Sequence, residues 1–386
     1  MTLVEFVPPT PHPLWKLCPQ MGITDVVVKV NPDLTGLPDP WRYETLASIV
    51  SRLKSAGLNV VGLEGDPFDM SPIKEYGAAE DFSRKEHKEH REVAIAHYRE
   101  LLESMGRLGI KLLCYNFMVG KGWSRTGVRE GRGGAKATYF SLKENVSHRD
   151  AETRSPEAAL GVNRGLGWNP REKNLCDSVS LCEKLILTAD QVWANYEHFI
   201  KSVMPTAEKC GVRMSLHPDD PCLPSLGGYA RIFGSVEAYD RAYAMYPSTS
   251  NAVTFCQANF KLMFTNPDNP VNPVNHVKTL SDLARHFGKR IAFIHVRDVE
   301  GTKEDFTELF HDQGDTDQFA LMRTYRKLGL DVPVRGDHVP EMAYDRVLTP
   351  EGTPGYFTLG RLFANGYLKA LLKGTIEGRK NAKREI

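Results

Sequence analysis

The chain has 386 residues, of which 41% are hydrophobic and 25% charged, an ordinary composition for a soluble globular protein. The formal net charge of +1 argues against nucleic acid as the main partner. No apolar run approaches the roughly 20 residues of a membrane span, and the N-terminal MTLVEFVPPTPHP lacks the features of a secretory signal. The seven cysteines are irregularly spaced without a CxxC pair, which predicts reduced thiols and a cytoplasmic protein.

Apolar, β-branched runs alternate with segments of helical spacing along most of the chain. Strands are predicted over 3–7, 24–30, 59–64 and 111–116, and in four later runs that end on His217, Cys256, His295 and Asp337. A short connection through Trp15 joins the first two strands. Helices are predicted over 40–57, 83–109, 188–211, 235–246, 277–288, 317–329 and 356–374. The third of these helices opens with a capping-box pattern at Thr188 and Gln191.

This alternation breaks between residues 119 and 187, a stretch rich in Gly, Arg, Lys and Glu. Its Gly-rich basic run lacks the GxxxxGK[ST] pattern of a phosphate-binding loop. Long loops in compact domains are usually functional or disordered. We therefore interpret 119–187 as an insertion within a single domain of residues 1–386, acting as a lid or as an oligomer contact.

Alternating strands and helices predict a parallel sheet in an α/β protein. Eight strands suit a (β/α)8 TIM barrel of about 250 residues, here with a long insertion after the fourth strand. The alternative is a doubly wound open sheet. That fold would bind a ligand at one switch point and not at several successive strand ends.

The last four predicted strands each end on a residue that can bind a metal ion. The intervals from 217 to 256 and from 256 to 295 are both 39 residues, and that from 295 to 337 is 42, as expected for successive β-α units. In a parallel barrel these strand ends meet at one mouth. His217, Cys256, His295 and Asp337 therefore predict a site for a divalent cation, and thiolate softness alone favours Zn or Fe.

Each of the four residues also has a purely structural interpretation. Cys256 could be a small apolar core residue, and the two histidines could be hydrogen-bonded in the core. Asp337 could pair with Arg335 or Arg297. The coincidence of four such residues at regular spacing favours a single site.

Short motifs along nearly the whole chain point to one family. They are CYNFM at 114–118, WSRT at 123–126, SLHPDDP at 215–221, RI at 231–232, FC at 255–256, HVR at 295–297, DH at 337–338, PGY at 354–356 and GYLKALL at 366–372. With these motifs, in this order, the chain resembles the D-mannonate dehydratase family of xylose-isomerase-like TIM barrels. The resemblance implies a lyase of hexuronate catabolism that removes water from D-mannonate to give 2-dehydro-3-deoxy-D-gluconate.

The resemblance also assigns roles to individual residues. It implies that His217, Cys256, His295 and Asp337 bind the metal, usually Mn(II) in this family, with Fe(II) or Zn(II) as further possibilities. It places His338 and Tyr356 near the metal as acid and base, in an order that stays open.

Three more residues are candidates for binding the sugar acid, and a homo-oligomer is expected. Arg125 and Arg297 could clamp its carboxylate, although a salt bridge at the barrel rim is an equal alternative for each. Asn116, at the end of the fourth strand, is the third candidate.

Two places depart from the family pattern, and both are expected to face the mouth. Val119–Gly122 stand where the family has Pro-Val-Phe-Asp, and Gln257–Asn259 where it has Thr-Gly-Ser. These changes leave two alternatives to a mannonate dehydratase. One is a metal-dependent isomerase or epimerase of a related acid or sugar, and the other is a metal-binding homologue without catalytic activity.

Overall fold

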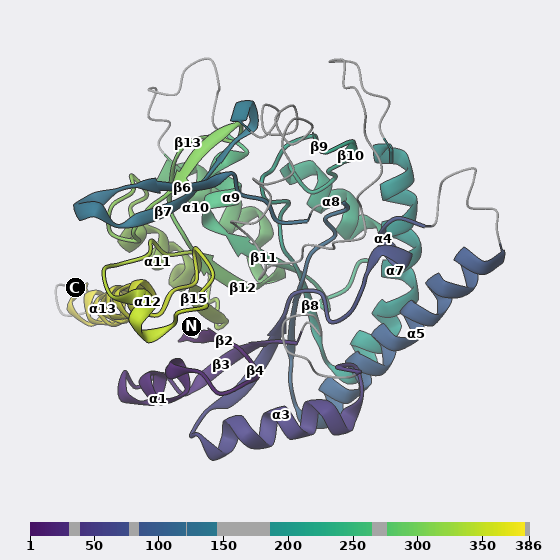
Figure 1. Ribbon diagram of the computed structural model, residues 1–386, viewed down its shortest axis with the longest axis horizontal. Coiled ribbons are helices and arrows are strands. Elements are labelled where there is room, and N and C mark those ends of the chain that lie inside the picture. The colour runs from purple at the N-terminus through teal and green to yellow at the C-terminus, as the bar shows by residue number, and fades with distance from the viewer. Residues whose placement is uncertain (31–38, 77–84, 121, 145–185, 265–275, 383–386) are drawn as a thin grey trace.

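In the computed structural model, nine parallel strand segments form one sheet. Helices lie around the outside of this sheet (Figure 1). The structure describes residues 1–30, 39–76, 85–120, 122–144, 186–264 and 276–382. Within these ranges the segments are β1 (Thr2–Leu3), β2 (Glu5–Val7), β3 (Asp25–Lys29), β4 (Asn59–Glu64), β5 (Leu112–Tyr115), β8 (Arg213–Leu216), β11 (Asn251–Cys256), β12 (Ile291–Val296) and β15 (Pro333–Gly336).

The sheet closes into a barrel because its first strand is shared between two neighbours. The predicted strand 3–7 is interrupted at Val4, so that β1 pairs with β15 while β2 pairs with β3, all in parallel. The remaining strands follow one another in chain order. With β1 and β2 counted as one strand, the described residues form the predicted (β/α)8 TIM barrel, and the open-sheet alternative is wrong.

The helices follow the strands as the sequence predicts, with four additions among the described residues. The helices are α1 (Pro13–Gln20), α3 (Tyr43–Ser55), α4 (Ser71–Lys74), α5 (Lys85–Leu108), α7 (Ala189–Cys210), α8 (Val236–Met245), α9 (Gln257–Leu262), α10 (His276–Phe287), α11 (Gln318–Lys327), α12 (Asp345–Leu348) and α13 (Thr358–Ala382). The four additions are α1, α4, α9 and α12. The connection through Trp15 is in fact the helix α1, which Pro13 and the capping side chain of His12 begin. The helix α9, directly after β11, was not predicted. Within the described ranges, every helix is too short or too polar to span a membrane.

The capping box predicted at the start of α7 is present, since the Thr188 side chain accepts from Gln191 N and the Gln191 side chain accepts from Thr188 N. Because the cap satisfies backbone donors that the helix leaves free, Thr188→Ala should lower the free energy of unfolding by about 0.5–2 kcal/mol. Urea denaturation measures this change. An unchanged midpoint would mean that the box contributes nothing to stability.

A second, antiparallel sheet contains part of the predicted insertion. Its strands are β6 (Gly127–Glu130), β7 (Lys136–Ser141), β13 (Val299–Thr302) and β14 (Asp305–Glu308), in the order β13-β14-β7-β6. The insertion after the fourth barrel strand is therefore joined to the loop after the seventh. The remainder of the insertion, 145–185, lies outside the described residues, and its role as a lid or oligomer contact stays a prediction.

The barrel interior changes from apolar to charged along the strands. Val27, Leu112, Ala252 and Phe293 belong to a small apolar cluster inside the barrel, apart from the larger core between sheet and helices. Nearer the carboxyl ends of the strands the buried side chains are charged. The functional residues predicted from the sequence are found at this end.

Candidate metal centre and active site

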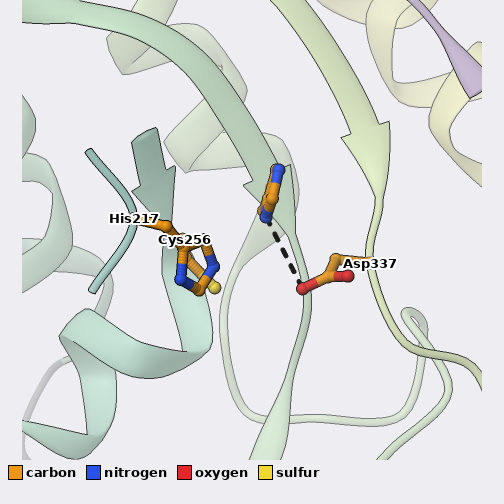
Figure 2. Close-up of side chains that lie close together, drawn as sticks. His217, Cys256 and Asp337 are labelled. Carbon is orange, nitrogen blue, oxygen red and sulfur yellow. Dashed lines mark ion pairs between the residues drawn. The ribbon is translucent and has the colours of Figure 1, made fainter. Parts of the chain in front are cut away.

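The structure brings the four predicted metal ligands together at the carboxyl ends of their strands. His217 directly follows β8, Cys256 ends β11, His295 lies in β12 and Asp337 directly follows β15. Cys256 and His295 are partners in the register of β11 and β12. One ligand atom from each of the four residues lies within 4.8 Å of those of the other three. Figure 2 shows His217 and Cys256 pointing toward Asp337 across the site.

The two imidazoles present free nitrogens to this cluster. His217 Nδ1 lies 2.7 Å from the carbonyl oxygen of Pro218, which can only accept, so Nδ1 carries the proton and Nε2 is left with its lone pair. Both ring nitrogens of His295 are buried without a hydrogen-bond partner among the described residues. Asp337 and Glu64 each lie 3.6 Å from one of these nitrogens. A buried, unpartnered imidazole is costly, and a bound cation would remove that cost.

The other two ligands are set up to be anionic. Burial acts to raise the pKa of the Cys256 thiol, but the neighbouring His217 and His295 and the charge of Arg297 outweigh it, and the pKa falls to about 6. Burial likewise opposes ionisation of Asp337, yet Arg335 and the neighbouring histidines hold the pKa of this carboxyl well below its usual range. A thiolate, a carboxylate and two imidazoles form a donor set that fits a divalent transition metal.

His338 and Tyr356 lie beside this cluster and contact each other. The Tyr356 hydroxyl is 2.8 Å from His338 Nε2 and 3.5 Å from an oxygen of Asp337. His338 Nδ1 lies 2.8 Å from Glu308 Oε1, which as a carboxylate oxygen accepts the Nδ1 proton. Trp123 packs edge-on against the His338 ring at 5.2 Å. The backbone of His338 has a φ of 41°, a left-handed conformation that costs a non-glycine residue of order 1 kcal/mol and is typical of functional sites.

Arg125 and Arg297 belong to a buried network with Asp220 and Glu308. Arg297 donates to Asp220 at 2.8 Å and to Glu308 at 2.7 and 2.8 Å. Arg125 donates to both oxygens of Asp220, at 2.8 and 2.9 Å, and to Glu308 Oε1. Burial would raise the pKa of Glu308, but Arg297, His338 and Arg125 bring it down to about 2. The guanidinium groups predicted to clamp a substrate carboxylate are thus bound to carboxylates of the protein.

Removing one cation from this network should destabilise the fold strongly. Arg297 is 1% exposed, so Arg297→Met would leave the carboxylates of Asp220 and Glu308 buried with only Arg125 between them. Breaking a buried ion pair in this way costs about 3–5 kcal/mol. Chemical denaturation measures the loss, with Arg285→Met as control, because Arg285 and its partner Asp282 are exposed. The two variants should differ by several kcal/mol, since an exposed pair contributes about 0–1 kcal/mol. Equal losses of unfolding free energy in the two variants would mean that the buried network does not contribute to stability.

Asn116, the third predicted substrate ligand, lies just past β5. Its Oδ1 accepts from the ammonium of Lys74 at 3.0 Å and from Met118 N at 3.1 Å. Lys74 also pairs with Asp66 at 2.7 Å. Asn116 is therefore held in place through its oxygen, and its amide nitrogen is the end that can reach a ligand.

In each of the two places that depart from the family pattern, one residue faces away from the mouth. Val119 is fully buried in the outer hydrophobic core, and the Gln257 amide donates to the Tyr325 hydroxyl of α11 on the helix side of the barrel. The expectation for these two residues is wrong. Asn259 does lie at the site, where its Oδ1 accepts from the Cys256 thiol at 2.9 Å and from Arg297 at 2.8 Å.

Sequence reasoning missed several residues of the site. Glu308 ends β14, in a hairpin that was not predicted, and Asp220 was noted only as part of the SLHPDDP motif. Glu64 ends β4 and binds Arg335 at 2.5 Å, which in turn reaches Asp337 at 2.9 Å. The one sequence signal that could have found these residues is a charged residue at the end of a predicted strand. Of the missed residues, Glu64 has this signal.

The fold and the donor set define an α/β barrel protein with a candidate metal centre at the carboxyl ends of its strands. Two solved structures show the same fold at low sequence identity. A xylose isomerase domain protein from Planctomyces limnophilus has a TM-score of 0.51 at 12% identity, with 98% of each chain covered. An L-ribulose 3-epimerase has a TM-score of 0.52 at 9% identity, covering 99% of this chain and 98% of the other.

The chain belongs to the D-mannonate dehydratase (UxuA) family, which it matches over residues 18–383. It is 29% identical to the mannonate dehydratase of Lachnoclostridium phytofermentans, over 87% of this chain and 88% of that one. The mannonate dehydratase of Brachyspira hyodysenteriae is 28% identical over 91% of both chains. The crystal structure of mannonate dehydratase from Streptococcus suis serotype 2 superposes with a TM-score of 0.72 at 22% identity, covering 98% and 96% of the two chains.

Proposed function

We propose that this protein is a metal-dependent hydro-lyase that converts D-mannonate to 2-dehydro-3-deoxy-D-gluconate and water in the cytoplasm. Membership of the family supports the reaction and the substrate. The observation that carries the proposal is the juxtaposition of the four-donor cluster with the His338–Tyr356 pair, in which the Tyr356 hydroxyl reaches both His338 and the metal-ligand carboxylate of Asp337.

The metal would be held by His217, Cys256, His295 and Asp337, and Mn(II) is the ion that the family resemblance implies. The thiolate also suits Fe(II) or Zn(II), which compete on affinity. A bound divalent cation would supply a Lewis acid for the substrate carboxylate and its neighbouring hydroxyl, and for the charge that develops when C2 loses its proton.

His338 and Tyr356 divide the proton transfers between them. Because Glu308 accepts the His338 Nδ1 proton, Nε2 carries a lone pair and not a proton, and it can remove the proton from C2. Burial, reinforced by Asp337, raises the pKa of Tyr356 well above its usual value, so its hydroxyl keeps a proton to give to the departing C3 hydroxyl. The C2–H and C3–O bonds break, water leaves, and the resulting enol becomes the 2-keto-3-deoxy acid.

Other residues shape the site around these groups. Arg125 and Arg297 keep Glu308 ionised and oriented toward His338. The Asn116 amide nitrogen donates to a substrate hydroxyl, and Trp123 forms one wall beside His338. Residues 1–386 act as one domain, with the 119–187 insertion as a lid or an oligomer contact and with a homo-oligomer as the working form.

The test is turnover of D-mannonate by metal-stripped protein before and after Mn(II) is restored. Keto-acid product that requires Mn(II) is the expected result. A product with the mass of the substrate would indicate an isomerase or epimerase. One bound metal per chain without turnover of D-mannonate or of other sugar acids would indicate a homologue that binds metal but has lost the reaction.

A further inference from the structure

Lys29 is a lysine inside the barrel, near the mouth. It ends β3, two residues beyond Val27, which lies in the apolar cluster of the barrel interior. Alternate residues of a strand face the same side of a sheet, so the Lys29 side chain also enters the barrel, nearer its carboxyl end. In the pairing of β3 with β4, Lys29 is the partner of Glu64.

Glu64 places Lys29 next to the metal centre. One Glu64 oxygen lies 3.6 Å from His295 Nε2, while the other lies 2.5 Å from Arg335. Paired residues of parallel strands share a face, so the Lys29 side chain enters the space that these groups border. Lys29 is half-buried.

Lys29 differs from the other basic side chains around the site in the contacts that the described residues make with it. Among the described residues, no hydrogen bond or ion pair is found for its ammonium group. The other cations each have a protein carboxylate: Arg125 and Arg297 with Asp220 and Glu308, Arg335 with Glu64 and Asp337, and Lys74 with Asp66.

The balance of charges around the site indicates that Lys29 would contact an anionic group. A divalent cation is matched by the Cys256 thiolate and the Asp337 carboxylate. Glu64 then matches Arg335, and Asp220 and Glu308 match the two other arginines. The positive charge of Lys29 is left over within this part of the described structure. Burial lowers the pKa of Lys29 to about 8, against the opposing effect of Glu64 and Asp66, so an anion bound nearby would stabilise the charged ammonium.

We propose that Lys29 binds the carboxylate of the substrate, and that this contact selects a sugar acid over a neutral sugar. The inference rests on the proposed function, since it assigns the acid group that a dehydratase of aldonates must recognise. A carboxylate has two oxygens and about four acceptor positions, so it can accept from Lys29 and still bind a cation. The same ammonium group stabilises the negative charge that develops on the carboxylate when C2 loses its proton.

The test compares an acid with its neutral amide. Isothermal titration calorimetry on Mn(II)-loaded protein measures binding of D-mannonate and D-mannonamide, in a His338→Asn background that prevents turnover. Adding Lys29→Met should weaken D-mannonate about 10- to 100-fold, the contribution of a hydrogen bond between charged groups, and leave D-mannonamide unchanged within about twofold. Lys29→Arg should restore most of the affinity for the acid. Lys16→Met, which removes an exposed positive charge, should change neither ligand.

The outcomes separate this inference from the proposed function. Equal weakening of acid and amide by Lys29→Met, or no weakening of the acid, would overturn the role of Lys29. If D-mannonate fails to bind but another aldonate, such as D-gluconate, binds in a Lys29-dependent way, the proposed substrate falls and the role of Lys29 stands. If no aldonate binds more tightly than its amide, the role of Lys29 is wrong even where Mn(II)-dependent turnover is observed.

Discussion

Replacing His338 by asparagine is expected to lower kcat by about 10²- to 10⁴-fold, the range that one acid or base group contributes. Asparagine can still donate to Glu308 but has no counterpart of the ring nitrogen Nε2, which contacts the Tyr356 hydroxyl at 2.8 Å. Because His338 is not among the four clustered ligands, the variant should still bind one metal ion per chain. Steady-state kinetics with D-mannonate and metal analysis of the same sample measure both quantities.

His286→Asn is the matched control, since His286 lies on the outside of the barrel against Asp240. Its kcat should equal that of the unmodified protein. A His338→Asn enzyme with more than a tenth of the normal kcat would exclude His338 as the base. Loss of metal together with activity would mean instead that His338 supports the neighbouring Asp337.

Replacing Cys256 by alanine is expected to abolish metal binding at micromolar concentrations. Loss of a residue that merely orients a ligand costs about 10- to 100-fold in affinity, and loss of a ligand costs more. The thiolate also supplies one of the two negative charges in the donor set, and alanine cannot replace it. Equilibrium dialysis followed by elemental analysis measures the stoichiometry, and turnover should fall with it.

Cys222→Ala controls for the loss of a buried thiol, because Cys222 is 2% exposed but packs with Leu223 and Phe140, away from the four ligands. It should keep one metal per chain. If Cys256→Ala also keeps its metal with unchanged affinity, the cluster binds through the two histidines and Asp337 alone.

The metal centre could be predicted from the sequence because each ligand is marked locally. A buried strand ending on a histidine, cysteine or aspartate is visible in a short window, and the barrel brings such ends together. Glu308 has no such mark, because its contacts with His338 and Arg125 join residues 30 and 183 positions away. The same limit applies to Asp220, which meets Arg125 across 95 residues.

Comparison with a family pattern locates a substitution along the chain but not the direction of its side chain. Gln257 directly follows Cys256, yet it begins α9 and turns toward Tyr325, while Asn259, two positions later in the same helix, contacts the thiol. Lys29 was not predicted as a site residue for a different reason. A lysine at a strand end is usually solvated, so only the strand register shows that it enters the barrel beside Glu64.

The interruption of the first strand at Val4 has a consequence for how the protein is made. The seam of the barrel joins β1, at the start of the chain, to β15, and Glu5 holds Arg361 and Asn365 of the last helix through its buried carboxylate. During synthesis β2 can pair with β3 early, but β1 and the Glu5 carboxylate find their partners only after more than 300 further residues have been made. Until these leave the ribosome, the nascent sheet has an unpaired edge, which favours aggregation and binding by chaperones.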